Sequence, residues 1–316
     1  MKEFSSRVDE VFPSGIRLDR YIADYLKILN RSQIKAKKLS AEINAKPVKL
    51  SRNIFGGEKI DLSWQDNETL FLVPENIDLN IVYEDERVIV LDKEQGMVVH
   101  PGAGNKNGTL ANALLYRRLN KKNELNSLND ISLNNNFNLR PGIVHRLDKD
   151  TSGIMIAAWD EDTHGFLGEQ FKKRKVIKTY AALVHGRLKN NSGKIDNIIY
   201  RSSKDRKKFT VNNNSKGRGR RSITWYKVFK NYGDFSLILI RPKTGRTHQI
   251  RVHMKHLGNP IIGDPLYGRE DRMFQNSTLM LHSKILKIKL PGNRSQTVFK
   301  TPLPQRFIDF IKKNDK

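Results

Sequence analysis

A thirteen-residue stretch in the middle of the chain, Pro141 to Gly153, constrains the fold more than any other part. Its opening Pro-Gly pair predicts a turn, and the alternation of residue types from Ile143 to Leu147 predicts a short strand. Residues 149–153 are polar and end in glycine, which predicts a loop. The continuous apolar run Ile154–Trp159 then predicts a buried strand. The stretch therefore places a polar loop at the end of a strand in a sheet.

Two charged side chains of this stretch fall on one side of the predicted strand. In an extended segment successive side chains point to opposite faces, so Arg146 and Asp148 share a face, opposite to His145 and Leu147. A guanidinium and a carboxylate then stand side by side where the loop begins. Loops on a rigid sheet commonly carry binding and catalytic residues, so this strand end is the first candidate site.

Three segments of the chain resemble one protein family. The sequence His145-Arg-Leu-Asp-Lys-Asp-Thr-Ser-Gly153 resembles the active-site motif of the RluA/RluD family of RNA pseudouridine synthases. Two later segments, Arg241-Pro-Lys-Thr-Gly-Arg-Thr-His-Gln-Ile-Arg-Val-His-Met254 and Pro260-Ile-Ile-Gly-Asp-Pro-Leu-Tyr-Gly268, are similar to further motifs of that family. The matches follow the family's order and cover most of residues 77–268. Tyr180, on a strand predicted over residues 178–184, falls where the family has its active-site tyrosine.

The resemblance implies a reaction and its catalytic carboxylate. The base of a uridine in structured RNA is detached from ribose, turned, and rejoined through a ring carbon, which needs no redox step and no cofactor. Asp148 is the expected catalytic residue, since cleaving a glycosidic bond calls for a carboxylate near the sugar or base. It could attack the ribose carbon, add to the base, or remove a sugar proton. Asp150, the rival carboxylate, suits a turn or capping role.

The resemblance gives three further residues a role. Arg246 is expected to pair with Asp148 and keep it ionised, because an opposite charge favours the charged form. Tyr180 is expected to stack on the detached uracil or to accept the proton that leaves the ring carbon. A uridine inside a stem must be flipped out to reach Asp148, and Arg146 is suited to fill the vacated stack.

The composition indicates a polyanionic partner. The chain has 316 residues, with 58 Lys plus Arg against 33 Asp plus Glu, a formal net charge of +25 and a pI near 10.1. A chain this basic is expected to bind nucleic acid. A membrane is the competing partner, but the sequence has no apolar stretch long enough to span one and no basic amphipathic helix with large exposed apolar residues. The absence of cysteine excludes disulfides, thiolate catalysis and cysteine-ligated zinc, and without a signal-peptide pattern we expect a cytoplasmic protein.

The first seventy residues predict a small RNA-binding domain. Apolar residues at helical spacing predict a helix over residues 17–26, a second helix is expected over residues 32–38, and small strands follow. The order resembles the S-four type RNA-binding module, through Arg17-Leu-Asp-Arg20, Arg31-Ser-Gln-Ile34 and Asn44-Ala-Lys-Pro-Val48. The alternative is a small helical cap with a solvated basic face. The expected RNA contacts in this domain are Arg17, Arg20, Arg31, Gln33, Lys35 and Lys38.

The predicted fold class is α+β. Residues 1–70 form the small helical RNA-binding domain, and residues 77–316 form a catalytic domain whose sheet is mixed, mainly antiparallel and flanked by helices. The asparagine-rich residues 120–139 predict a surface insertion, and the basic run over residues 201–221 predicts an arm that grips phosphates. His253 and His256 lack a cysteine or nearby carboxylate to complete a metal set, so no metal site is expected.

Two classes of function fit these observations. The first is an RNA pseudouridine synthase that acts on structured RNA as a monomer without a cofactor. The S-four-like module makes large-subunit ribosomal RNA its expected substrate. The rival is a non-catalytic RNA-binding protein that assists ribosome assembly, which the composition, the module and the basic arm fit equally well. Asp148, Tyr180 and Arg246 separate the two classes, and all three are present.

Overall fold

The chain separates into two compact units, Met1–Phe71 and Leu72–Lys316. Their folds come from a computed structural model. It describes residues 2–12, 15–29, 33–34, 37–64, 72–102, 104–121, 141–212, 219–268, 274 and 277–315. Two of the expected RNA contacts, Arg31 and Lys35, lie outside these residues, as does most of the predicted insertion over residues 120–139.

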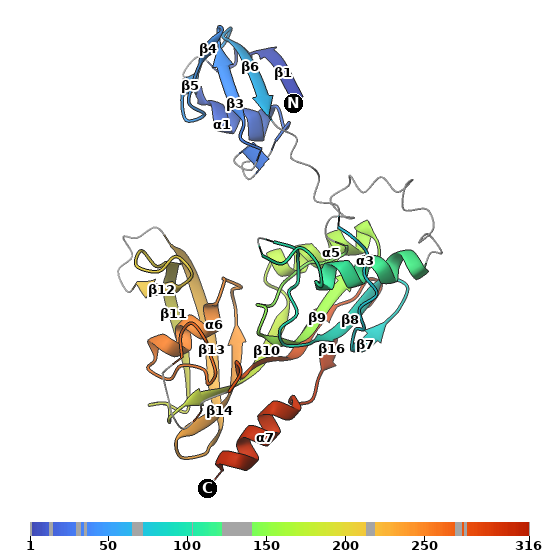
Figure 1. Ribbon diagram of the computed structural model, residues 1–316, viewed down its shortest axis with the longest axis vertical. Coiled ribbons are helices and arrows are strands. Elements are labelled where there is room, and N and C mark those ends of the chain that lie inside the picture. The colour runs from blue at the N-terminus through green and yellow to red at the C-terminus, as the bar shows by residue number, and fades with distance from the viewer. Residues whose placement is uncertain are drawn as a thin grey trace. The chain divides into compact units, whose positions relative to one another are not determined.

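The first unit holds more strand than its sequence predicted. Its described elements are β1 (Lys2–Arg7), β2 (Ile16–Arg17), α1 (Leu18–Arg20), a π-helix η1 (Tyr21–Tyr25), β3 (Ser40–Ile43), β4 (Lys46–Pro47), β5 (Asn53–Ile54) and β6 (Lys59–Trp64). An antiparallel sheet of order β1-β6-β3-β4 packs its alternate residues onto the helical segment, and β2 pairs with β5 (Figure 1). The expected helix over residues 17–26 is confirmed in type and begins with α1. Of the second helix, only residues 33 and 34 are helical within the described part.

The second unit is built on a ten-stranded sheet of order β12-β11-β13-β14-β10-β15-β9-β8-β7, with β16 paired to β15. Every pairing is antiparallel except that of β15 with β9, so the predicted mixed, mainly antiparallel sheet is confirmed. The strands are β7 (Ile81–Glu84), β8 (Val88–Lys93), β9 (Ser152–Ala158), β10 (Ile177–His185), β11 (Ser192–Arg201), β12 (Phe209–Asn212), β13 (Arg220–Asn231), β14 (Phe235–Pro242), β15 (Leu281–Lys289) and β16 (Gln296–Lys300). The helices are α3 (Leu110–Lys121), α5 (Glu161–Lys172), α6 (Gln249–His256) and α7 (Gln305–Asn314).

Continuous apolar runs make β8 and β9 central strands with a core on each face. Alternate residues of β9 enter different cores: Met155 belongs to the core that includes α3, and Ile156 to the core that includes α5. The two helices therefore cover opposite faces of this end of the sheet (Figure 1). Asp160 caps α5 by accepting a hydrogen bond from the Thr163 backbone N–H at 2.7 Å. Central strands of this kind give the loops at their ends a rigid base.

The predicted strand over residues 143–147 is wrong beyond its first residue. Ile143 forms an isolated bridge with Ala157, and the chain then leaves the sheet. A side chain takes the place of the missing backbone partner, because His145 Nε2 accepts a hydrogen bond from the Ile156 N–H of β9 at 3.1 Å. The His145 ring also stacks on Phe171 of α5, with centroids 4.6 Å apart. The segment that carries Asp148 is thus an extended loop held by a histidine.

The far side of this loop is anchored by a buried polar chain. Ser152 Oγ lies 2.9 Å from His282 Nδ1 of β15, and His282 Nε2 lies 2.8 Å from Thr301 Oγ1. Arg306 of α7 donates from Nη2 to the same Ser152 Oγ at 2.6 Å. A residue in the last helix therefore supports the start of β9, 154 positions earlier in the chain.

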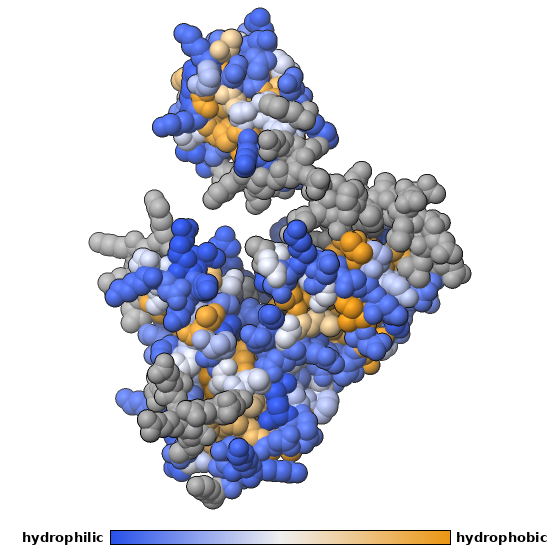
Figure 2. Space-filling view, in the orientation of Figure 1, coloured by the Kyte–Doolittle hydropathy of each residue, from blue (hydrophilic) through white to orange (hydrophobic). Residues whose placement is uncertain are grey.

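Among the described residues, no helix combines the length and the apolar character that crossing a membrane requires. The visible surface of each unit is mainly hydrophilic, as expected from the charge of the chain (Figure 2).

Candidate active site

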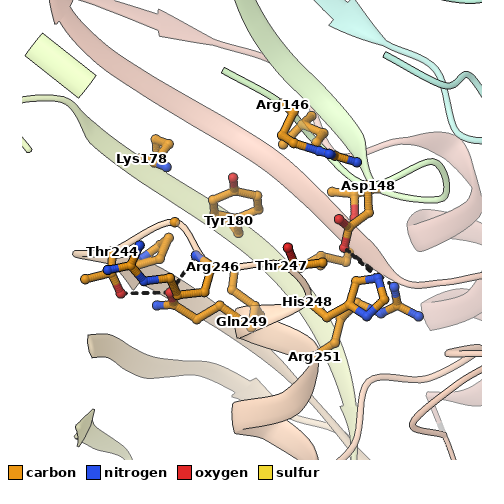
Figure 3. Close-up of a pocket in the computed structure, with 16 residues that line it drawn as sticks. Arg146, Asp148, Lys178, Tyr180, Thr244, Arg246, Thr247, His248, Gln249 and Arg251 are labelled. Atoms are coloured by element: carbon orange, nitrogen blue, oxygen red, sulfur yellow. Dashed lines mark hydrogen bonds and ion pairs between the residues drawn. The ribbon is translucent and has the colours of Figure 1, made fainter. Parts of the chain in front are cut away.

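Four of the residues singled out from the sequence line one cavity in the second unit. Asp148 and Arg146 come from the loop before β9, Tyr180 from β10, and Arg246 from the turn between β14 and α6 (Figure 3). The cavity has a volume of about 120 Å³. Segments nearly a hundred positions apart thus meet because β14 and β10 are neighbours in the sheet and β15 joins β10 to β9.

Asp148 lies against a guanidinium, but not the expected one. Arg251 Nη1 is 3.5 Å from Asp148 Oδ2, and His248 Nε2 is 3.9 Å from the same oxygen. The predicted pairing with Arg246 is wrong: Figure 3 shows Arg246 apart from Asp148, next to Thr244 and Gln249. The reason is the backbone between the two arginines. His248 adopts a left-handed conformation with φ of 55°, so the chain turns sharply before α6 begins and Arg251 points back at the carboxylate.

Arg251 is held by a second carboxylate from behind. Its Nε and Nη2 donate to the two oxygens of Asp264 at 2.8 and 2.7 Å, a bidentate pair in which Arg251 is 3% exposed. Asp264 Oδ1 also accepts hydrogen bonds from the backbone N–H groups of Leu266 and Tyr267. Burial acts to lower the pKa of Arg251, but Asp264 and Asp148 raise it on balance. The guanidinium therefore stays charged and fixed beside Asp148.

His248 faces the same carboxylate in its neutral form. Burial lowers the pKa of His248, and the attraction of Asp148 opposes that effect without reversing it. The other ring nitrogen, Nδ1, lies 2.9 Å from the Tyr267 hydroxyl, which fixes the orientation of the ring. His248 thus presents a polar but uncharged edge to Asp148 at neutral pH.

The turn that carries Arg246 is held by the side chain of Gln249. Gln249 Oε1 accepts from the Thr244 hydroxyl at 2.7 Å and from the Arg246 backbone N–H at 3.0 Å. Its Nε2 donates to Ile223 O and Thr224 Oγ1 on β13. His248 is the N-cap of α6, and its side chain makes no capping hydrogen bond. The Gln249 amide thus fixes the turn before the helix, because it reaches back to Thr244 and Arg246.

Tyr180 forms part of the cavity wall and is 7% exposed. Burial is the main reason that the pKa of its phenol lies above the ordinary value, and the nearby charge of Asp148 adds to the increase. The phenol is protonated at neutral pH. To accept a proton from a substrate it would first have to give up its own, whereas stacking on a base needs no such step.

Sequence reasoning missed four residues of this site: Arg251, His248, Gln249 and Lys178. The first three lie in the segment Gly245-Arg-Thr-His-Gln-Ile-Arg251, in which only Arg246 was predicted to have a role. The signal was available there, since a helix that begins at residue 249 presents its first turn to the preceding loop. Lys178 precedes Tyr180 by two positions on β10, and the strand period puts both on the same face.

The remaining predicted residues fall in two groups. In the first unit Arg17, Arg20, Gln33 and Lys38 are exposed, and Arg17 forms an ion pair with Asp19 at 2.9 Å. In the second unit the Nδ1 of the buried His253 lies 2.8 Å from Thr224 Oγ1, within the packing of α6 on β13. No set of three side chains suited to a metal ion occurs in the described part of the chain.

Comparison with known proteins gives the fold and the site a context. The sequence pattern of one family, RNA pseudouridylate synthase, matches residues 87–256. This interval includes Asp148, Tyr180, Arg246 and Arg251.

Several relatives are similar over most of their length. One is the ribosomal large subunit pseudouridine synthase D of Borreliella burgdorferi, which is 42% identical over 94% of this chain and 89% of its own. The protein of the same name from Haemophilus ducreyi is 33% identical over 94% of this chain and 90% of its own.

Among solved structures, human RNA pseudouridylate synthase domain containing 1 is 28% identical and matches with a TM-score of 0.55 over 75% of this chain and 86% of its own. Human RNA pseudouridylate synthase domain containing 4 is 25% identical, with a TM-score of 0.57 over 74% and 92%.

Proposed function

The chain belongs to the family of RNA pseudouridylate synthases, and from this membership we infer that it is an enzyme that isomerises uridine to pseudouridine in large-subunit ribosomal RNA. The observation that supports this function most directly is the position of Asp148. Its carboxylate lines a cavity open to an RNA base and lies 3.5 Å from a buried guanidinium. The rival function, a non-catalytic assembly factor, gives no reason to maintain such a pair inside a cavity.

We propose that Asp148 is the catalytic residue of this isomerisation. The glycosidic bond breaks more readily when a carboxylate lies near the sugar or the base. Asp148 can do this by attacking the ribose carbon, by adding to the base, or by removing a sugar proton. Arg251 serves each route equally, because it holds the carboxylate in place and carries a charge opposite to it.

The other residues of the cavity suit the handling of a flipped base. Arg146 is exposed at the cavity rim, where it can fill the stack that the uridine leaves. Tyr180 offers an aromatic face to the detached uracil or takes up the proton released from the ring carbon. Arg246, with its backbone fixed by Gln249, is placed to bind the substrate rather than to pair with Asp148.

The first unit is proposed as an S-four-like RNA-binding domain over residues 1–70, next to a catalytic domain over residues 77–316. Its exposed Arg17, Arg20, Gln33 and Lys38 support that role, since an exposed basic surface suits contact with phosphates. Together with the net charge of +25 they favour structured RNA as the partner. We also propose that the enzyme acts as a monomer, in the cytoplasm and without a cofactor.

Replacing Asp148 with asparagine tests the proposed function. The amide keeps the size of the side chain but can neither attack carbon nor take up a proton effectively. Turnover of Asp148→Asn is therefore expected to fall by about a thousandfold or more, while RNA affinity stays within about threefold. Tritium release from RNA labelled on the uracil ring measures the reaction, and filter binding of the same RNA measures affinity.

Asp150→Asn is the matched control, because it makes the same change two positions along the loop. It is expected to keep most of the activity. Appreciable tritium release by Asp148→Asn would contradict the assignment of the catalytic residue. Failure of the unsubstituted chain to release tritium from large-subunit RNA would contradict the function itself.

A further inference from the structure

A second cavity opens beside the catalytic one, with a volume of about 380 Å³. The two share several wall residues, among them Arg146, Lys178 and Arg246, so they lie side by side. Among the described residues, no carboxylate lines the second cavity. We call it the cationic groove, after the six basic residues in its wall: Arg146, Lys172, Arg174, Lys178, Lys243 and Arg246.

These charges are poorly compensated within the protein. Among the residues that the structure describes, Lys172 alone of the six has a carboxylate at ion-pair distance, Glu169 at 3.0 Å. Burial lowers the pKa of Lys178. The pKa of Arg246 is lowered by burial first and then by repulsion from Arg220 and Arg174. Basic side chains this close repel one another, which destabilises the protein without a ligand. A bound anion would offset this repulsion.

Arg174 reaches the groove at the cost of backbone strain. It follows α5 in a left-handed conformation with φ of 56°, where the Lys175 N–H donates to Gln170 O at 2.9 Å and ends the helix. Glycine commonly occupies this position, and a residue with a side chain costs about 1 kcal/mol there. An arginine at such a site is explained if its charge is needed in the groove.

Lys178 lines both cavities. Its ammonium lies next to the bare backbone of Gly245, where an added Cβ would be 3.7 Å from Nζ. His145, the other titratable neighbour of Lys178, is neutral because burial, followed by the charge of Lys178, lowers its pKa to about 3. Among the described residues, no carboxylate lies at ion-pair distance from the Lys178 ammonium.

We propose that Arg174, Lys178 and Arg246 bind an RNA backbone phosphate next to the flipped uridine, so that the groove fixes the phosphate while the cavity receives the base. This assignment rests on the proposed function for the nature of the ligand. A phosphodiester has the charge and the acceptor oxygens that suit three basic side chains without a carboxylate partner among the described residues. The target nucleoside is covalently joined to this phosphate in the RNA. Its base therefore has to cross only the wall that the two cavities share.

The test compares two variants that each remove one positive charge from adjacent positions. Arg174→Gln removes a groove residue, whereas Lys173→Gln removes a lysine that does not line the groove and pairs with Glu169 on the surface. RNA affinity is measured over a range of KCl concentrations. For Arg174→Gln we expect about tenfold weaker binding and a plot of log affinity against log salt that is shallower by about 0.7 to 0.9. For Lys173→Gln both quantities are expected to match the unsubstituted chain.

Lys178→Met is the second variant, and it is expected to lose affinity and slope as Arg174→Gln does. Equal slopes for Arg174→Gln and Lys173→Gln would overturn the proposal, as would an unchanged slope for Lys178→Met. The binding slope is read without reference to turnover. If the chain makes no pseudouridine but the variants show the expected slopes, the proposed function is contradicted and the phosphate site is supported. If the chain makes pseudouridine but the slopes of the variants are unchanged, only the phosphate site is contradicted.

Discussion

Arg251 joins two carboxylates in unlike surroundings: Asp148 lines the cavity, and the side chain of Asp264 has no exposed surface. The sequence correctly predicted a guanidinium beside Asp148 but assigned the wrong arginine. Arg246 and Arg251 lie five positions apart in one motif, and residue types alone do not distinguish them. The choice depends on the left-handed turn at His248, and no periodicity in the sequence indicates a backbone angle at a single histidine.

Removing the Arg251 charge is expected to affect stability and activity through different partners. In Arg251→Met the Asp264 carboxylate, whose side chain has no exposed surface, loses its counter-charge. Leaving such a charge buried should lower the free energy of unfolding by about 3–5 kcal/mol, measurable by urea titration. The double variant Arg251→Met, Asp264→Asn should regain most of that stability, because the uncompensated charge is gone.

Activity should not follow stability in this pair of variants. Asp148 still lacks its guanidinium in the double variant, so tritium release is expected to stay at least about a hundredfold below normal. Recovery of turnover together with stability would show that Arg251 serves the fold and not the catalytic carboxylate.

At the scale of elements, the local predictions held where the hydrophobic pattern was continuous. The apolar run of β9 and the strand that holds Tyr180 are confirmed. The order of strands in the sheet was not predictable, because the pairing of β9 with β15 joins segments about 130 residues apart. The segment before Asp148 was predicted as a strand but is a loop. The His145 side chain, rather than the backbone of this segment, accepts the hydrogen bond from the Ile156 N–H of β9.

The junction between that loop and β9 depends on Gly153. Its φ is 119°, and an added Cβ would lie 2.3 Å from Ser283 O on β15, so Gly153→Ala combines backbone strain with a backbone clash. We expect it to lower the free energy of unfolding by more than about 3 kcal/mol, measured by urea denaturation. Gly96→Ala is the control, since Gly96 also has positive φ but open space around it, and about 1–2 kcal/mol is expected. Equal losses would mean that the close approach of β9 and β15 adds nothing.

At the scale of the whole molecule, buried histidines set a limit on acid stability. Burial is the largest of the effects that lower the pKa values of His145 and His282 to about 3 and that of His253 to about 4. All three belong to the second unit. In the unfolded chain their pKa values return to about 6.5. Between pH 6.5 and 4 the unfolded state therefore binds more protons, and stability must fall as the pH falls.

The predicted loss is up to about 1.4 kcal/mol per pH unit for each histidine, which adds to the effects of other groups. Urea titrations of the second unit's transition at pH 7, 6 and 5 measure it. His253→Asn keeps an acceptor near Thr224 but cannot titrate, so the dependence of stability on pH should be shallower by about that amount in this variant. An unchanged dependence would show that His253 is not forced to be neutral in the folded state.

The contact between Arg306 and Ser152 has a consequence for the newborn chain on the ribosome. The start of β9, next to the loop that carries Asp148, lacks this hydrogen bond until synthesis has passed residue 306. Translation adds about 5–20 residues each second, so roughly 8 to 30 seconds separate the synthesis of Ser152 from that of Arg306.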